Sequence, residues 1–144
     1  VQTNKLYTDT FFGLALRRLT GRGVMVTQAS SPFYARRAYW CVVRTVEAAV
    51  DRMAAAGAGE PLTVAPYHVY VPSFGDWGFV MAGPKRLCGE ELRLSRTGRY
   101  LTDSVFAHAR VFAPDCDAAP AEVNRLDHPV LVRYHYADWS RWGE

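Results

Sequence analysis

The chain has 144 residues, of which 49% are hydrophobic and 22% are charged, and its formal net charge is +3. This length and composition are typical of one globular domain and exclude a disordered chain. The 17 basic residues are scattered rather than gathered into one run, which argues against nucleic acid as the main partner. No apolar run approaches the ~18 residues that span a bilayer, and the sequence shows no signal peptide.

Cysteine and histidine spacing gives no sign of a metal site or of a disulfide framework. The three cysteines are an odd number and form no CxxC pair. Neither HxH nor HxxxH spacing occurs among the four histidines, which are His68, His108, His128 and His135. We therefore expect no bound metal, and free thiols at Cys41, Cys88 and Cys116.

The first third of the sequence predicts a loop, a helix, a strand and a second helix. Residues 1–7 read as loop, and Thr8 can cap a helix over 8–20 in which apolar residues recur at helical spacing. Residues 24–28 predict a strand that is apolar on both faces, like a central strand covered by helices. Ser30 or Ser31 then caps a long helix that ends within 54–59. Its expected buried stripe is Tyr39, Val42, Val43, Val46, Val50 and Met53.

The next third predicts a hairpin. Strands over 62–71 and 77–82 are joined by a turn at 72–76, which is too short for a parallel connection. Pro66 indicates an edge strand or a bulge. The pattern weakens after Pro84. We expect a short helix capped within 102–104, a loop over 113–121, a strand or extended arm at 130–134 and a helical turn over 138–144.

This order of elements predicts the end of a mostly parallel α/β sheet with a reversed last strand. Only 22 residues precede Gly23, too few for a nucleotide-binding half, and the sequence opens on Val1. We therefore interpret the chain as the back half of an α/β enzyme, and expect it to be a fragment.

Polar and aromatic residues mark one candidate site. Gln28 ends the first strand, where ligands bind in open α/β sheets. Segment 70–79 is rich in aromatic residues and either binds a flat or cationic group or simply packs as a hairpin. Asp76 can pair with an amine or serve the turn. The sequence Gly21-Arg22-Gly23 is no dinucleotide fingerprint, because a strand rather than a helix follows it.

Four blocks resemble, in order, the carboxyl-terminal half of the polyamine aminopropyltransferases, the spermidine synthase family. They are KLYTDTFF at 5–12, GVMVTQASSPFY at 23–34, PYHVYVPSFGDWGF at 66–79 and EVNRLDHPVLV at 122–132. They are similar to the family's LYS-x-EFY, Q-x-x-SP-[FY], VPSFG-x-WGF and EVNRLDNPVLV segments. The resemblance is strongest to bacterial members fused to a membrane-embedded amino-terminal region.

The resemblance implies a Rossmann-like, methyltransferase-type fold. Residues 1–84 would form the carboxyl-terminal half of that domain, and residues 85–144 an extension packed on it. The implied reaction transfers an aminopropyl group from decarboxylated S-adenosylmethionine to putrescine or a similar amine, without a metal. The family's catalytic carboxylate lies in a D-x-x-D-P loop that is absent here and is expected upstream of Val1. We therefore expect no catalytic residue in this piece, and no activity from it alone.

The acceptor side of the family's site maps onto this chain. Gln28 matches a glutamine near the amine pocket. Phe74 stands where many relatives carry a tyrosine, so the acceptor amine is left open. The other residues expected to line the pocket are Tyr7, Ser73, Asp76 and Trp77.

Two other functions stay open from sequence. One is an S-adenosylmethionine-dependent methyltransferase of the same architecture, and the other is a non-catalytic binding or assembly module. Because half a sheet leaves the first strand with an unpaired edge, we expect a homo-oligomer. We expect a cytoplasmic location for this region, with the parent protein held at the inner or plasma membrane by segments outside this sequence.

Overall fold

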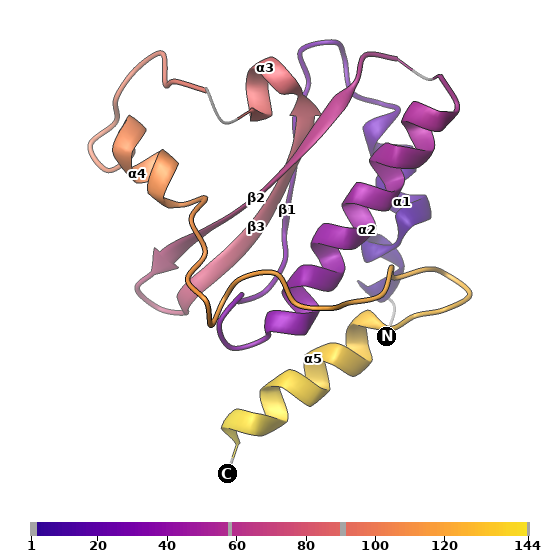
Figure 1. Ribbon diagram of the computed structural model, residues 1–144, viewed down its shortest axis with the longest axis vertical. Helices are drawn as coiled ribbons and strands as arrows, with labels where there is room; N and C mark the ends of the chain where they lie inside the picture. The colour runs from indigo at the N-terminus through magenta and orange to yellow at the C-terminus, as the bar shows by residue number, and fades with distance from the viewer. Residues whose placement is uncertain (1–2, 58, 90–91, 144) are drawn as a thin grey trace.

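A three-stranded antiparallel sheet organises the chain (Figure 1). The computed structural model describes residues 3–57, 59–89 and 92–143. The strands are β1 (Met25–Gln28), β2 (Leu62–Val71) and β3 (Gly75–Pro84), in the order β1-β3-β2. The predicted edge position of the strand that carries Pro66 is confirmed, because β2 pairs only with β3 among the described residues.

The predicted parallel pairing is wrong for the described residues. The tight turn after β2 keeps β3 antiparallel to β2, and β1 pairs antiparallel with the other side of β3. The strands β1 and β2 therefore run in the same direction but are separated by the inserted β3. Strand order depends on contacts between distant segments, which explains why local patterns did not predict this insertion.

The two faces of the sheet differ. Residues paired across strands face the same side, so Thr27 shares a face with Val80, and Gln28 shares the opposite face with Phe79. Val80 lies in the core against α2 (Arg36–Ala55). The expectation that both faces of β1 are covered is wrong, because Val26, on the Gln28 side, is 50% exposed.

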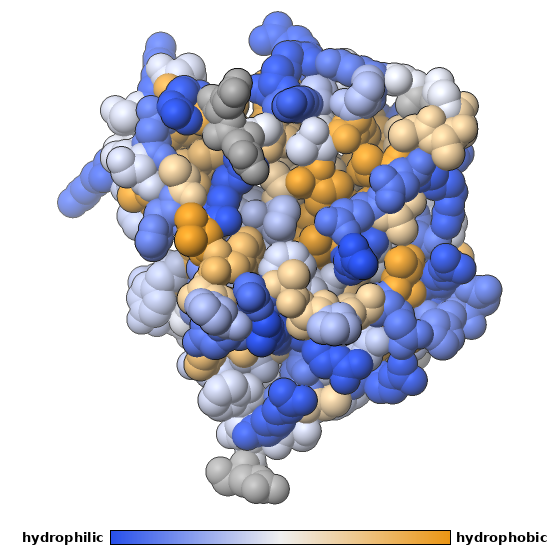
Figure 2. All heavy atoms as spheres, in the orientation of Figure 1, coloured by the Kyte–Doolittle hydropathy of each residue, from blue (hydrophilic) through white to orange (hydrophobic). Residues whose placement is uncertain are grey.

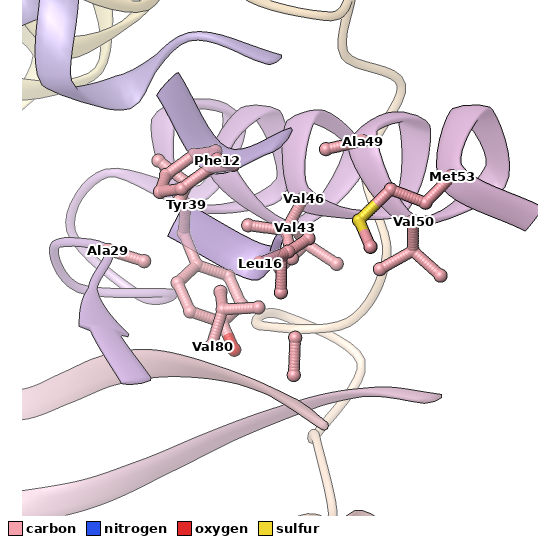
Figure 3. Close-up of a cluster of buried hydrophobic side chains, with 12 residues drawn as sticks. Phe12, Leu16, Ala29, Tyr39, Val43, Val46, Ala49, Val50, Met53 and Val80 are labelled. Carbon is pink, nitrogen blue, oxygen red and sulfur yellow. The ribbon is translucent and has the colours of Figure 1, made fainter. Parts of the chain in front are cut away.

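The core lies between α2 and the sheet. All six residues of the predicted stripe on α2 are buried. Figure 3 shows Val43 and Val46 of α2 meeting Leu16 of α1 (Asp9–Leu16) in this layer. Ser31 caps the turn that leads into α2, since its Oγ accepts hydrogen bonds from the N–H groups of Phe33 (3.2 Å) and Tyr34 (3.1 Å).

The amino-terminal segment is more helical than predicted at its start and less at its end. Residues Thr3–Tyr7 form the 3-10 helix η1 rather than a loop. The predicted cap is confirmed, because Thr8 Oγ1 accepts from the N–H of Phe11 at 3.2 Å. Helix α1 ends at Leu16, and Leu19 belongs to a turn that leads to β1.

Two short helices cover part of the other face. They are α3 (Lys85–Cys88) and α4 (Asp103–His108), and Thr102 caps α4 by accepting from the N–H of Val105 at 3.2 Å. Ala65 and Met81 are buried there beside Cys88. Figure 2 shows apolar side chains still exposed in the middle of the face in view, between hydrophilic side chains at its rim.

The carboxyl-terminal segment is helical. The expected strand or arm at 130–134 is wrong, because α5 (Leu131–Trp139) begins there and continues into the 3-10 helix η2 (Ser140–Trp142). Val130, Tyr134 and Asp138 are buried at helical spacing and pack towards α2. Within the described ranges, no helix is both long and apolar enough to cross a membrane.

Candidate functional site

The ends of β1 and β3 bring the main predicted residues to one end of the sheet. Because these strands are antiparallel, Gln28 at the end of β1 lies opposite Phe79, and Trp77 follows towards the hairpin tip. The ladder continues past Gln28, since the N–H of Ala29 donates to Gly78 O at 2.9 Å. The predicted proximity of the glutamine to the hairpin is therefore present in the structure.

This end of the sheet exposes an amide beside aromatic rings. Gln28 is exposed and shares its face with Trp77 and Phe79. The ring centroids of Phe74 and Trp77 are 5.5 Å apart, and those of Phe79 and Tyr67 are 5.3 Å apart and nearly parallel. Phe74 is 62% exposed. An amide that donates and accepts hydrogen bonds, next to ring faces that attract cations, suits a flat or cationic ligand.

Asp76 lies on the other face of the hairpin. Alternation along β3 places it on the side of Gly78 and Val80, away from Gln28. Its Oδ1 is 2.6 Å from His68 Nδ1, on β2. Both residues line a cavity of about 580 Å³ between the hairpin and α4, together with Tyr70, Tyr100, Ser104 and His108.

The two remaining predicted residues lie apart from this aromatic face. Ser73 is exposed in the hairpin turn. Tyr7 is half-buried and packs edge-on against Phe12, with ring centroids 6.2 Å apart. Its carbonyl accepts a hydrogen bond from Asn124 Nδ2 at 2.9 Å. The structure thus joins Tyr7 to the core rather than to the hairpin.

Sequence reasoning missed two backbone features of this end. Ser30 adopts a left-handed conformation with φ of 72°, and its carbonyl accepts from the N–H of Gly78 at 2.7 Å. A Cβ on Gly78 would lie 2.3 Å from Tyr39 Cε2, so only glycine lets the hairpin approach α2 this closely. The glycine was visible in the sequence, but its neighbour Tyr39 is distant in the chain. Nothing in the sequence around Ser30 indicates its conformation.

Burial shifts the pKa values of the Tyr39 hydroxyl and the Cys116 thiol. Burial raises the pKa of the Tyr39 hydroxyl far above its ordinary value, and the charge of Asp76 adds to this shift. Tyr39 donates weakly to the carbonyls of Tyr67 (3.4 Å) and Phe79 (3.3 Å). Burial also raises the pKa of Cys116 to about 11. Tyr39 is therefore a neutral hydrogen-bond donor at pH 7, and the Cys116 thiol is protonated.

Cys41, Cys88 and Cys116 are free, as predicted, and all three are buried. Burial raises the pKa of Cys41 to about 12, so its thiol is not a ready nucleophile at pH 7. In the part of the chain that the structure describes, no group of three or more His, Cys, Asp or Glu side chains is arranged to hold a metal ion.

These features define the class of the protein. The described residues form a mixed α/β fold whose final hairpin strand is inserted into the sheet, with a polar and aromatic candidate site at the strand ends. No family model matches the chain. The curated proteins that it resembles are polyamine aminopropyltransferases.

The relatives share about two fifths of the aligned residues. The chain is 43% identical over 143 residues, 97% of its length, to the polyamine aminopropyltransferase of Corynebacterium efficiens. It is 37% identical over 137 residues (95%) to that of Leptospira interrogans and 38% over 136 residues (94%) to polyamine aminopropyltransferase 2 of Ralstonia nicotianae. The chain spans only 24–25% of the length of these relatives. It belongs to the polyamine aminopropyltransferase family and corresponds to about a quarter of such a protein.

Proposed function

We propose that this chain supplies one wall of the amine site of an aminopropyltransferase. The whole protein would transfer an aminopropyl group from decarboxylated S-adenosylmethionine to putrescine or a similar amine. The observation that carries the proposal is the placement of Gln28 beside the aromatic residues of the hairpin, at one end of the sheet. Homology over nearly the whole chain to proteins of this name supports it.

The chemistry of an amine acceptor fits this wall. A diamine carries a distal ammonium and a methylene chain, which an aromatic face binds through its ring quadrupole and its apolar surface. The Gln28 carbonyl oxygen can accept a hydrogen bond from an ammonium. We assign Gln28, Phe74 and Trp77 to direct contact with the amine, Ser73 to the rim, and Tyr7 to support from the core.

The reaction also needs a group that accepts the amine proton, and we place this group outside the chain. The unprotonated amine nitrogen attacks the carbon beside the sulfonium, and the C–S bond breaks to release a neutral thioether. The new ammonium then loses a proton to a general base. We propose that the carboxylate of the family's D-x-x-D-P loop serves as this base. On this proposal, residues 1–84 belong to the sheet domain, residues 85–144 form its extension, and the chain alone is inactive.

The assembly and location of the whole protein are further proposals. The outer edge of β1 is unpaired among the described residues, and we propose that another strand covers it, as in a homo-oligomer. A constant monomer mass in light scattering of the chain at high concentration would contradict self-association. We propose that segments outside this chain hold the whole protein at a membrane.

The decisive experiment assays the full-length protein with putrescine and decarboxylated S-adenosylmethionine, detecting spermidine by mass spectrometry. Gln28→Met keeps the side-chain length and removes the amide, so we expect kcat/KM for putrescine to fall about tenfold. Val26→Ala, on the same face of β1 but two residues from its end, is the matched control and should change it less than twofold. A wild type that forms no aminopropylated product contradicts the proposal, and a methylated product from S-adenosylmethionine would favour a methyltransferase.

A further inference from the structure

The contact between His68 and Asp76 has no part in the function proposed above. His68 Nδ1 lies 2.6 Å from Asp76 Oδ1, and His68 Nε2 lies 2.8 Å from the carbonyl oxygen of Val111. The imidazole ring also packs on Phe112, with centroids 4.6 Å apart. The side chains of His68 and Asp76 are only 19% and 27% exposed. The ring of His68, which lies on β2, is thus held by Asp76 of β3 and by the segment after α4.

Both ring nitrogens of His68 face an acceptor. A neutral imidazole donates one hydrogen bond, whereas the imidazolium donates two. In the tautomer that carries its proton on Nδ1, the His68 ring donates this hydrogen bond to the Asp76 carboxylate. The Asp76 carboxylate is thus engaged by His68 and lies on the face of the hairpin opposite the one that carries Gln28.

Asp76 lies where the hairpin turn becomes strand β3, so its contact with His68 affects the residues on either side. Asp76 directly follows Gly75, which adopts a φ of 75°, and directly precedes Trp77. A side chain fixed at Asp76 therefore fixes the point where the turn becomes strand. Trp77 points to the opposite face, where it contacts Phe74. Holding Asp76 thus determines where both aromatic rings stand.

We propose that His68 is a positioning residue that acts through Asp76 to hold the hairpin aromatic residues Phe74 and Trp77 in place for the amine. The inference rests on the proposed function and deepens it, because it gives Asp76 a structural role in holding the hairpin rather than a role in binding the ammonium of the substrate. It also predicts the direction in which amine binding changes when His68 is replaced. If Asp76 holds the hairpin through His68, removing His68 weakens amine binding. If Asp76 instead binds the amine, removing His68 frees the carboxylate and leaves binding unchanged or stronger.

Two amide substitutions at His68 separate its two hydrogen bonds. In His68→Asn the amide nitrogen can take the position of Nδ1 and still donate to Asp76. In His68→Gln the longer side chain reaches towards the Val111 carbonyl and loses the donor to Asp76. The variants are made in the full-length protein, and KM and kcat are measured with putrescine.

We expect His68→Gln to raise KM for putrescine about tenfold with kcat changed less than about twofold, and His68→Asn to raise it less than about threefold. Asp76→Ala should also raise KM about tenfold, and the double variant His68→Gln with Asp76→Ala should be no worse than either single one. His108→Gln, which changes the other histidine of the same cavity, is the control and should leave KM within about twofold.

Other patterns overturn the inference. They include an unchanged or lower KM in His68→Gln beside a raised KM in Asp76→Ala, additive effects in the double variant, or equal KM values in the two His68 variants. Where His68→Gln does not fold, the other two single variants decide, and the inference requires a KM near wild type in His68→Asn and a raised one in Asp76→Ala. A wild type without aminopropylated product refutes the proposed function, and this inference with it, before any variant is compared.

Discussion

The buried side chain of Asn124 offers the sharpest test of what holds this chain together. Its Oδ1 accepts hydrogen bonds from the N–H groups of Val130 (2.9 Å) and Leu131 (3.1 Å), and its Nδ2 donates to the carbonyl of Tyr7 (2.9 Å). The first two bonds cap the start of α5, and the third ties that helix to the segment before α1. One side chain therefore joins both ends of the described chain.

The substitution Asn124→Ala removes these three side-chain bonds and keeps the backbone bonds of residue 124. Each bond contributes about 1 kcal/mol net, and the N–H of Val130 is left buried without its acceptor. We expect the free energy of unfolding to fall by about 3–5 kcal/mol, a large part of the ~5–15 kcal/mol of a typical domain. The urea midpoint should fall by about 2 M.

The assay is urea unfolding followed by tryptophan fluorescence, combined with hydrogen exchange of the peptide that covers α5. Exchange of the Val130 and Leu131 amides should speed up, because their shared acceptor is lost. Asp127→Ala changes an exposed residue of the same loop and should alter stability by less than about 0.5 kcal/mol. A loss below about 1 kcal/mol for Asn124→Ala, or unchanged exchange in α5, would refute the reasoning.

Two further predictions concern packing and charge. Gly78→Ala should destabilise the chain by about 2–4 kcal/mol in the same urea assay, because its Cβ would lie 2.3 Å from Tyr39 Cε2. Gly13→Ala, in a helix with nothing within 4 Å of the new Cβ, should stabilise it by up to about 1 kcal/mol, and equal effects would contradict this account. Hydrogen bonds from Tyr134, then His128, lower the pKa of Glu122 below its ordinary value. This contribution is complete above the unfolded pKa and is lost as the pH falls through the folded one, so stability curves of wild type and Glu122→Gln should converge in acid.

Sequence patterns predicted the elements whose structure is set locally. Strand β2 has the predicted bounds, Leu62–Val71, and Thr8, Ser31 and Thr102 cap helices or turns as expected. Caps and periodicity act within a few residues, so they can be recognised without the fold. The helix α5 was missed because its first turn depends on the side chain of Asn124, seven residues before Leu131. Its apolar start resembles a strand until that acceptor is known.

The sequence predicted the strand end and the hairpin that form the candidate site, but not the side-chain contacts within it. Gln28 and the hairpin meet because β1 pairs with β3, a pairing that the sequence did not predict. The polar end of the first strand indicated only a place where a ligand could bind. The partner of Asp76 was not predictable, because His68 reaches it only through the register of β2 with β3. Because His68 is not part of an HxH or HxxxH pattern, the sequence around it gave no indication of its role. Its role depends on contacts that also include the carbonyl of Val111.

The free edge of β1 connects the fold to the candidate site. Gln28 and the half-exposed Val26 lie on that strand, on the face that α2 does not cover. An unpaired strand with exposed apolar side chains attracts another strand, and such a partner would lie directly beside Gln28. The described residues build a wall of amide and aromatic rings at the end of this sheet. A strand paired with this edge would lie in the plane of the sheet and extend that wall beyond Gln28.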